Sequence, residues 1–474
     1  MSNFFQASDL RQIFQPLHDN LSRRFTQHKT YLGEFAVVVS LFYMSILGKK
    51  GYSTVLKAMA EDLNELLEWE DLIPSNSALT QARRKVPEER FKILLSQLYD
   101  SCTHAKQHPI LQFHHHRLVA VDGTDIELPS DRRLRCVFAA AKKSKADPDS
   151  PDLPHAGLVM LQDISHDLPI NFEITNTTAN ERACTLKMMD HLHHGDVLIA
   201  DRGFPSKEIF HQLAERKIDF VIRLAKNQFT ESGAFAESGK REGTITIDCK
   251  DAKGRKNVWK KPLHLRLVRD DNVDPDGDPR ILITSLTDTK KYPTEDIWFC
   301  YARRWRIETA FREMKIYDGL EHIQARTPAG VRQEISAIVI FQLLISELAG
   351  VIRHQEPELS QVKPATNIKA IAGRTETAVY HTTYIKECPY NFNRVLMRTC
   401  LHYLLKHALA EDWTAAQRSL MTSVKYLWRC KQKRRPGRSY SRIPKSVHAK
   451  AKPSRRRAAS KRAKDKNKNK KDNA

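Results

Sequence analysis

The stretch Tyr301-Ala-Arg-Arg-Trp-Arg-Ile-Glu-Thr-Ala-Phe-Arg-Glu-Met-Lys315 has the pattern of a single amphipathic helix. Tyr301, Arg304, Glu308 and Lys315 lie at offsets of 0, 3, 7 and 14 along it. At about 100° per residue these four side chains point within roughly 60° of one another, and Arg312 lies close to the same direction. The spacing therefore predicts a helix that aims one carboxylate and several cations the same way.

A neighbouring face of this helix carries Ile307, Phe311 and Met314 and is suited to packing against a sheet. A carboxylate flanked by fixed cations suits a metal-assisted reaction on phosphate, in which the acid holds the ion and the cations hold phosphate oxygens. The alternative is a solvated basic helix with ion pairs between residues four apart.

Two further acids end apolar runs upstream, in Arg117-Leu-Val-Ala-Val-Asp122 and Asp196-Val-Leu-Ile-Ala-Asp201. Each run predicts a strand that delivers a carboxylate at its carboxyl end. Around them the pattern predicts strands over 157–164, 168–174 and 220–225 and helices over 179–192 and 206–217. The predicted order is three strands, helix, strand, helix, strand.

The spacing Y-x2-R-x3-E-x6-K, formed by Tyr301, Arg304, Glu308 and Lys315, resembles the signature of DDE transposases of bacterial insertion sequences, specifically the insertion sequence 4 family. The resemblance implies an RNase H-like core in which Asp122, Asp201 and Glu308 are the catalytic residues.

Because carboxylate oxygens suit Mg²⁺ or Mn²⁺, these three acids are also the predicted metal ligands. By the same resemblance Arg304 and Lys315 hold transposon-end phosphates, and Tyr301 contacts the DNA end near the scissile bond.

The predicted fold class is α/β, with an RNase H-like core interrupted by a β-rich insertion. A helical amino-terminal domain precedes the core and a helical carboxyl-terminal region follows it. The predicted parts are a DNA-end-binding domain (1–110), the first part of the core (111–226), the insertion (227–295), the second part of the core with the Tyr-Arg-Glu-Lys helix (296–350), a helical region with possible dimer contacts (351–430) and a basic disordered tail (431–474).

Residues 74–86 contain Ser75 as a helix N-cap candidate, followed by Arg83 and Arg84 on a helix whose basic side chains are expected at the surface. After the helical pattern around 52–63, this could be the second helix of a helix-turn-helix that reads a DNA groove. An ordinary basic helical pair is the alternative. Arg312 and Lys226 are further predicted DNA contacts.

Charge is concentrated at the carboxyl end of the sequence. The 474 residues carry a net charge of +22, and from Lys431 onward 19 residues are basic and 2 acidic, which leaves the body at only about +5. Such a tail is expected to be disordered until it meets a polyanion such as DNA.

The eight cysteines are scattered singly, which favours a reducing cytosol and no disulfide framework or cysteine zinc site. The resemblance implies a bacterial cytoplasm and association with the nucleoid. Two apolar runs, 35–48 and 335–350, are shorter than the ~20 residues that span a bilayer and predict buried helices.

The predicted function is a transposase that cuts double-stranded DNA at its element's terminal inverted repeats and joins the 3′-hydroxyl ends to target DNA, acting as a homodimer on DNA. A catalytically inactive DNA-binding relative is the main alternative. Two weaker alternatives are a covalent Tyr301 nucleophile and a zinc hydrolase. The zinc ligands would come from His114, His115 and His116 with His191, His193 and His194.

Overall fold

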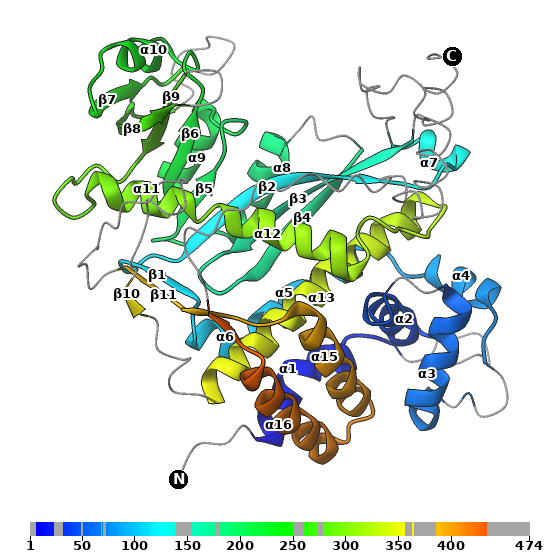
Figure 1. The fold of residues 1–474 in the computed structure, drawn as a ribbon. Helices are drawn as coiled ribbons and strands as arrows, with labels where there is room; N and C mark the ends of the chain where they lie inside the picture. The colour runs from blue at the N-terminus through cyan, green and yellow to red at the C-terminus, as the bar shows by residue number, and fades with distance from the viewer. Residues whose placement is uncertain are drawn as a thin grey trace, which may run out of the picture.

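The computed structural model describes residues 6–22, 32–48, 51–67, 69, 73–138, 153–176, 181–250, 259–273, 278–355, 363–364 and 385–433. Within these ranges an eight-stranded sheet is surrounded by many helices, which gives a mixed α/β fold (Figure 1). The strand order in this sheet is β4-β3-β2-β5-β6-β9-β8-β7. The predicted basic tail lies outside the described residues from position 434 onward.

Five strands form the half of the sheet that was predicted as the core. β2 (Leu118–Glu127), β3 (His155–Asp163) and β4 (Leu168–Thr175) are antiparallel neighbours. β5 (Val197–Ala200) and β6 (Asp219–Leu224) continue the sheet parallel to β2. With α8 (Glu181–Met188) before β5 and α9 (Lys207–Glu215) before β6, the predicted order of three strands, helix, strand, helix, strand is confirmed.

The strands predicted for the insertion are present and lengthen the same sheet. β7 (Glu242–Ile247), β8 (Leu263–Val273) and β9 (Pro279–Thr284) are antiparallel, and β9 pairs with β6. A short helix, α10 (Thr230–Glu237), precedes them. The segment predicted as an insertion therefore continues the sheet of β2 to β6 through backbone hydrogen bonds.

The two faces of the sheet pack into different hydrophobic clusters, as the two-residue period of a strand requires. On β2, Val119 and Val121 pack with α9 residues such as Ile209, whereas Leu118 and Ala120 join the cluster of α5 (Glu88–Ser101) and α13 (Pro328–Gln355). Asp122 continues the register of Leu118 and Ala120, which is also the face covered by α12 (Trp305–Glu313).

The two apolar runs are buried helices, as predicted. They form α2 (Glu34–Ile46) and the middle of α13, both lined almost entirely by buried side chains. Among the described residues, α13 is the one helix with the length and apolar composition needed to cross a membrane, and its apolar window is fully covered by the rest of the protein. A helix that is apolar on all sides is expected in the core of a large protein.

The helices at the two ends of the chain share one hydrophobic core with α13 (Figure 1). For example, His18 on α1 contacts the carbonyl oxygen of Ala408 on α15 at 3.1 Å. The amino-terminal helices are α1 (Ala7–Asp19), α2, α3 (Tyr52–Leu67), α4 (Asn76–Arg83), α5 and α6 (Thr103–Gln107). The carboxyl-terminal ones are α15 (Arg394–Leu409) and α16 (Trp413–Arg429).

The remaining elements are short. They are α7 (Arg132–Arg135), the 3-10 helix η2 (Met189–His191), α11 (Thr294–Ala302), the π-helical turn η3 (Met314–Asp318), the sheet of β1 (Leu111–Phe113), β10 (Lys363–Pro364) and β11 (Ile385–Glu387), and the pair β12 (Tyr390–Asn391) and β13 (Gln432–Lys433).

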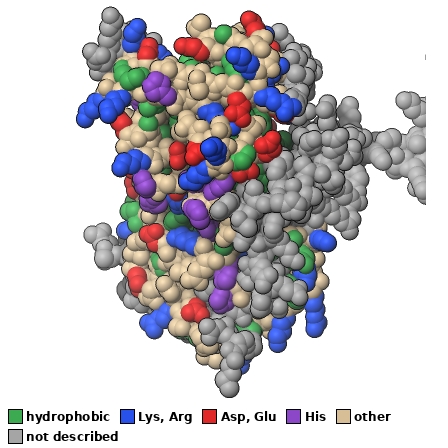
Figure 2. Space-filling model, turned by 90° about the vertical axis from the view of Figure 1, so that its left-hand side faces the viewer, with side chains coloured by type: hydrophobic (Ala, Val, Ile, Leu, Met, Phe, Trp, Pro, Cys, Tyr) green, Lys and Arg blue, Asp and Glu red, His purple; other side chains and the backbone are tan. Residues whose placement is uncertain are grey.

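Lysine and arginine side chains are interspersed with aspartate and glutamate on the face of the molecule in Figure 2. This mixture agrees with the nearly balanced charge of the body, in contrast to the basic tail. On this face, electrostatic attraction to DNA would have to come from local groups rather than from a broad basic surface.

Candidate active site

The register of two parallel strands brings two predicted acids together. β2 pairs with β5 up to Ala120 opposite Ile199, so Asp122 and Asp201 each follow two residues after the last paired position. Asp201 comes directly after β5, as predicted. The prediction that Asp122 ends its strand is wrong, because β2 continues to Glu127 through its pairing with β3.

The prediction of one helix over 301–315 is also wrong. α11 ends at Ala302, α12 begins at Trp305, and the π-helical turn η3 follows from Met314. At the break, the amides of residues 303, 304, 306 and 307 bond to carbonyls three residues back instead of four, which tightens the turn. Arg303 and Arg306 on either side of the break both pair with Glu387 of β11.

Despite the break, three groups of the signature converge on the two aspartates. The Tyr301 hydroxyl donates to Asp201 Oδ1 at 3.0 Å. Arg304 Nη1 donates to Asp122 Oδ2 at 3.1 Å, and Arg304 Nη2 lies 2.7 Å from Glu308 Oε1. The structure therefore gathers Asp122, Asp201, Tyr301 and Glu308 around the guanidinium group of Arg304.

The electrostatics of this cluster follow from its burial and its charges. Burial raises the pKa of Asp122 to about 6 against the opposing effect of Arg304. Burial also acts to raise the pKa of Asp201, but Arg304, a backbone amide and the Tyr301 hydroxyl outweigh it, so the pKa is lowered. Asp201 is thus fully ionised at neutral pH, whereas Asp122 begins to take up a proton just below neutral pH.

Glu181 is an acid of this site that the sequence analysis missed. A side-chain carbon placed on Gly123, next to Asp122, would lie 2.2 Å from Glu181 Oε1. Burial, and then the charges of Asp122, Asp125 and Asp201, raise the pKa of Glu181 to about 7. In the sequence, Glu181 looks like an ordinary acid in the first turn of a helix, so no signal distinguished it.

The carboxylates at this site are of the type that binds a divalent cation, but their arrangement in the structure is less suited to one. Carboxylate oxygens are the ligands that Mg²⁺ and Mn²⁺ prefer. Burial, and after it the neighbouring carboxylates, raise the pKa of Asp122 and of Glu181, and a bound cation would oppose both effects. However, Arg304 holds two of the three predicted ligands. Among the residues that the structure describes, no three His, Cys, Asp or Glu side chains are grouped so that they could hold a metal ion.

The other predicted DNA contacts lie in different surroundings. Lys315 is half-buried in η3 and has no hydrogen bond or ion pair with any described residue, and Arg312 is exposed on α12. Lys226, just beyond β6, lies 3.8 Å from Asp278, whereas Arg223 within β6 lies 4.0 Å from Asp201.

The predicted Ser75 N-cap of α4 is confirmed, because its side chain accepts from the Ala78 amide. The surface position predicted for Arg83 is wrong. Arg83 is only 5 % exposed and its Nη1 lies 3.0 Å from Glu334 Oε1 of α13. Arg84, the next residue, is exposed as predicted.

The zinc alternative is not supported by the contacts of the histidines. His114 pairs with Asp296 at 2.8 Å, and His116 contacts the carbonyl of Gly195 and the Tyr292 hydroxyl. The covalent tyrosine alternative is disfavoured as well, since burial raises the pKa of Tyr301 and opposes formation of the phenolate.

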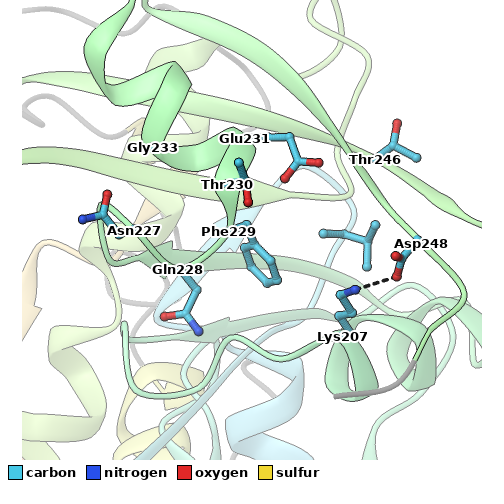
Figure 3. Close-up of a pocket in the computed structure, with 10 residues that line it drawn as sticks. Lys207, Asn227, Gln228, Phe229, Thr230, Glu231, Gly233, Thr246 and Asp248 are labelled. Carbon is cyan, nitrogen blue, oxygen red and sulfur yellow. Dashed lines mark hydrogen bonds and ion pairs between the residues drawn. The ribbon is translucent and has the colours of Figure 1, made fainter. Parts of the chain in front are cut away.

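A separate cavity of about 620 Å³ lies between α9, α10 and β7 (Figure 3). Its lining is mainly polar, and at one side of it the Lys207 ammonium pairs with Asp248 at 2.6 Å. None of the predicted site residues lines this cavity, so it is distinct from the candidate active site.

Comparison with known proteins points to one class. Residues 113–344, just under half of the chain, match the family model described as "Transposase DDE domain". This match supports a transposase of the DDE class, and with it DNA recombination and transposition. The matched range includes Asp122, Asp201, Tyr301, Arg304 and Glu308.

No curated protein matches the sequence. Among solved structures, the protein is similar to the piggyBac transposase in a cryo-EM structure of its synaptic complex with hairpin DNA. The TM-score is 0.44 at 9% sequence identity, and the alignment covers 90% of this chain and 86% of that chain.

Proposed function

We propose that this chain is a transposase of the insertion sequence 4 family, which cleaves DNA at the ends of its element and joins the 3′-hydroxyl ends to target DNA. The observation that carries this proposal is the placement of Asp122, Asp201 and Glu308 around the guanidinium group of Arg304, within the range that matches the DDE domain. The substrate is double-stranded DNA with terminal inverted repeats, and the active form is a homodimer on DNA in the bacterial cytoplasm, associated with the nucleoid.

In this proposal Asp122, Asp201 and Glu308 hold Mg²⁺ or Mn²⁺, which when bound supplies positive charge over the reacting phosphate and an activated oxygen nucleophile. Before DNA and the ion bind, Arg304 pairs with Asp122 and with Glu308 through its two terminal nitrogens. Tyr301 orients Asp201 by donating a hydrogen bond to it.

Phosphate contacts come from cations beside these acids. Lys315, the cation of the signature, is the first of these proposed contacts, and its ammonium forms no hydrogen bond or ion pair with any described residue. Arg312 and Lys226 are the other proposed contacts near the site, and Arg84 is a proposed contact on α4. On DNA binding, Arg304 would move from Asp122 and Glu308 to a DNA phosphate. It would then have an anionic partner both before and after DNA binds.

A DNA-binding protein without catalysis is the second candidate. It is favoured by one observation, that the Arg304 guanidinium lies between two of the three predicted metal ligands. If Arg304 stays there when DNA binds, an ion cannot be shared by these acids.

The test is strand cleavage of DNA that carries the sequences flanking the gene, in the presence of Mg²⁺ or Mn²⁺. Wild type is expected to cut at the repeat ends, and Glu308→Ala is expected to lower the rate by at least about a hundredfold, because removing a single group that stabilises the transition state has that effect in other enzymes. Binding of the same DNA should stay near wild type.

Glu321→Ala is the matched control, because Glu321 is an exposed acid near the same segment but outside the cluster. Specific binding without cutting by wild type would favour the non-catalytic candidate. Equal cutting by wild type and Glu308→Ala would reject the assignment of Glu308.

A further inference from the structure

A second cavity, of about 290 Å³, lies where the amino-terminal helices meet the start of α13. Side chains from α3, α4 and α7 line it, together with the segment that leads into α13. Four of the lining residues are arginines, namely Arg83, Arg84, Arg133 and Arg326. This density of guanidinium groups in one cavity is not explained by the chemistry of the candidate active site.

One of the four arginines holds the wall of the cavity. Arg83 pairs with Glu334 at 3.0 Å and donates to the Gly330 carbonyl at 2.8 Å, which ties α4 to the first turn of α13. A side-chain carbon on Gly330 would lie 2.9 Å from Thr327 Oγ1 and 3.4 Å from Arg83 Nη2. The wall is therefore closely packed and built before any ligand arrives.

The remaining arginines leave an excess of positive charge. Arg133 is compensated by Asp131 at 3.0 Å. Arg84 and Arg326 are both exposed, and neither has a hydrogen bond or an ion pair with a residue that the structure describes. Asp131 also acts electrostatically on Arg326. The four guanidinium groups thus share two carboxylates, Glu334 and Asp131, which leaves two positive charges in excess at the cavity.

We propose that this cavity binds a backbone phosphate of DNA through Arg84 and Arg326. A guanidinium group presents two parallel N–H donors that match two oxygens of a phosphate, so each arginine can donate two hydrogen bonds to the same phosphate. The first turn of α13, where Ala329 lines the cavity, adds the partial positive charge of a helix amino terminus. This inference rests on the proposed function for the identity of the ligand as DNA.

The position of the cavity explains what such a contact would do. Arg84 directly follows α4, the helix that was predicted to read a DNA groove. Arg326 lies between the helices of the candidate active site and α13. A phosphate held by both would fix the duplex to the amino-terminal helices and to the catalytic part at the same point. The contact would position the DNA without reading its sequence.

The test compares the full-length wild type with the variant Arg84→Gln/Arg326→Gln on short duplexes taken from the DNA flanking the gene. The logarithm of the binding constant is measured against the logarithm of salt concentration. Loss of one phosphate contact is expected to reduce the magnitude of the slope by about 1. Phosphate ethylation interference should show one position where ethylation weakens wild-type binding but not the variant's.

Arg132→Gln is the matched control, since Arg132 is an exposed arginine on α7 that does not line the cavity. Arg84→Lys/Arg326→Lys, which keeps the charge, should restore most of the slope. Equal slopes and equal interference patterns for the double variant and the Arg132 control would overturn the phosphate site.

The outcome is separable from failure of the proposed function. If the wild type binds and cuts the flanking DNA, and the double variant shows the same salt-dependence slope as the wild type, only this phosphate site is rejected. Wild type that neither binds nor cuts that DNA would reject the proposed function. In that case a rise in the unfolding temperature with inorganic phosphate, absent in the double variant, would assign the cavity to a free anion instead of DNA.

Discussion

At the scale of single residues, Arg304 organises the candidate site. Its two terminal nitrogens contact carboxylates from β2 and α12, while Tyr301 holds the third carboxylate. The helical spacing predicted that Arg304 and Glu308 face the same way, but it could not show that Arg304 reaches Asp122, which lies 182 positions earlier in the chain. Contacts of that kind depend on strand register, which a local pattern does not report.

Replacement of Arg304 by glutamine is expected to destabilise the fold in a pH-dependent manner. The change leaves Asp122 and Glu308 without their cation, at an expected cost of about 1 to 3 kcal/mol in the free energy of unfolding at pH ~8. Because the pKa of Asp122 is already about 6 and rises without Arg304, Asp122 is protonated at pH ~5 and needs no partner. Urea unfolding at both values should therefore show a smaller loss at pH ~5.

Addition of Asp122→Asn to Arg304→Gln serves as the control. It removes the uncompensated buried charge, so the double variant should regain part of the stability lost at the higher pH. An identical loss at both pH values, with no recovery in the double variant, would contradict the ion-pair account.

At the scale of elements, the sequence predicted the strands better than the helix breaks. The runs that end in Asp122 and Asp201 are strands because alternating or continuous apolar residues report burial directly. The break at Arg303 and Arg304 was missed because it depends on the distant Glu387, which pairs with Arg303 and Arg306. The burial of Arg83 was missed for the same reason, since its partner Glu334 lies on α13.

Asp62 joins two helices from opposite ends of the chain and should make their contact sensitive to acid. On α3 it lies 2.9 Å from both Lys406 and His402 of α15. Burial acts to raise the pKa of Asp62, but the hydrogen bonds from Lys406 and His402 outweigh it, so the pKa is lowered. Its stabilising contribution is therefore present above the ordinary Asp pKa of about 3.9 and lost as pH falls through the lowered value.

Asp62→Asn is accordingly expected to lower the free energy of unfolding by about 1 to 2 kcal/mol at neutral pH, and the difference from wild type should shrink below pH ~4. Thermal or urea unfolding across this range measures it. Glu61→Gln is the comparison, because Glu61 forms only an exposed pair with Lys57 at 3.8 Å and should have little effect at any pH. A deficit for Asp62→Asn that persists in acid would argue against the ionic origin.

At the scale of the whole molecule, one hydrophobic cluster connects the first helix to the last described one. It runs from Leu10 on α1 through α13 to Leu427 on α16. The sequence predicted helical regions at both ends but not their union, because amphipathic periodicity shows which face of a helix is buried and not which partner covers it. The amino-terminal helices and the part of the protein that carries the candidate active site are consequently expected to unfold together.

Arg83 provides the sharpest test of that cooperativity. It is buried with Glu334 at the junction of α4 and α13, so Arg83→Ala leaves a buried carboxylate without its cation and should cost about 3 to 5 kcal/mol. If the core is one cooperative unit, far-ultraviolet circular dichroism and tryptophan fluorescence should report coincident urea transitions in wild type and in the variant, with only the midpoint shifted. Glu334→Gln in the Arg83→Ala background should recover part of the loss, because it removes the uncompensated charge. Two separated transitions, with only the first moved by Arg83→Ala, would instead mean that the amino-terminal helices form an independent folding unit docked on α13.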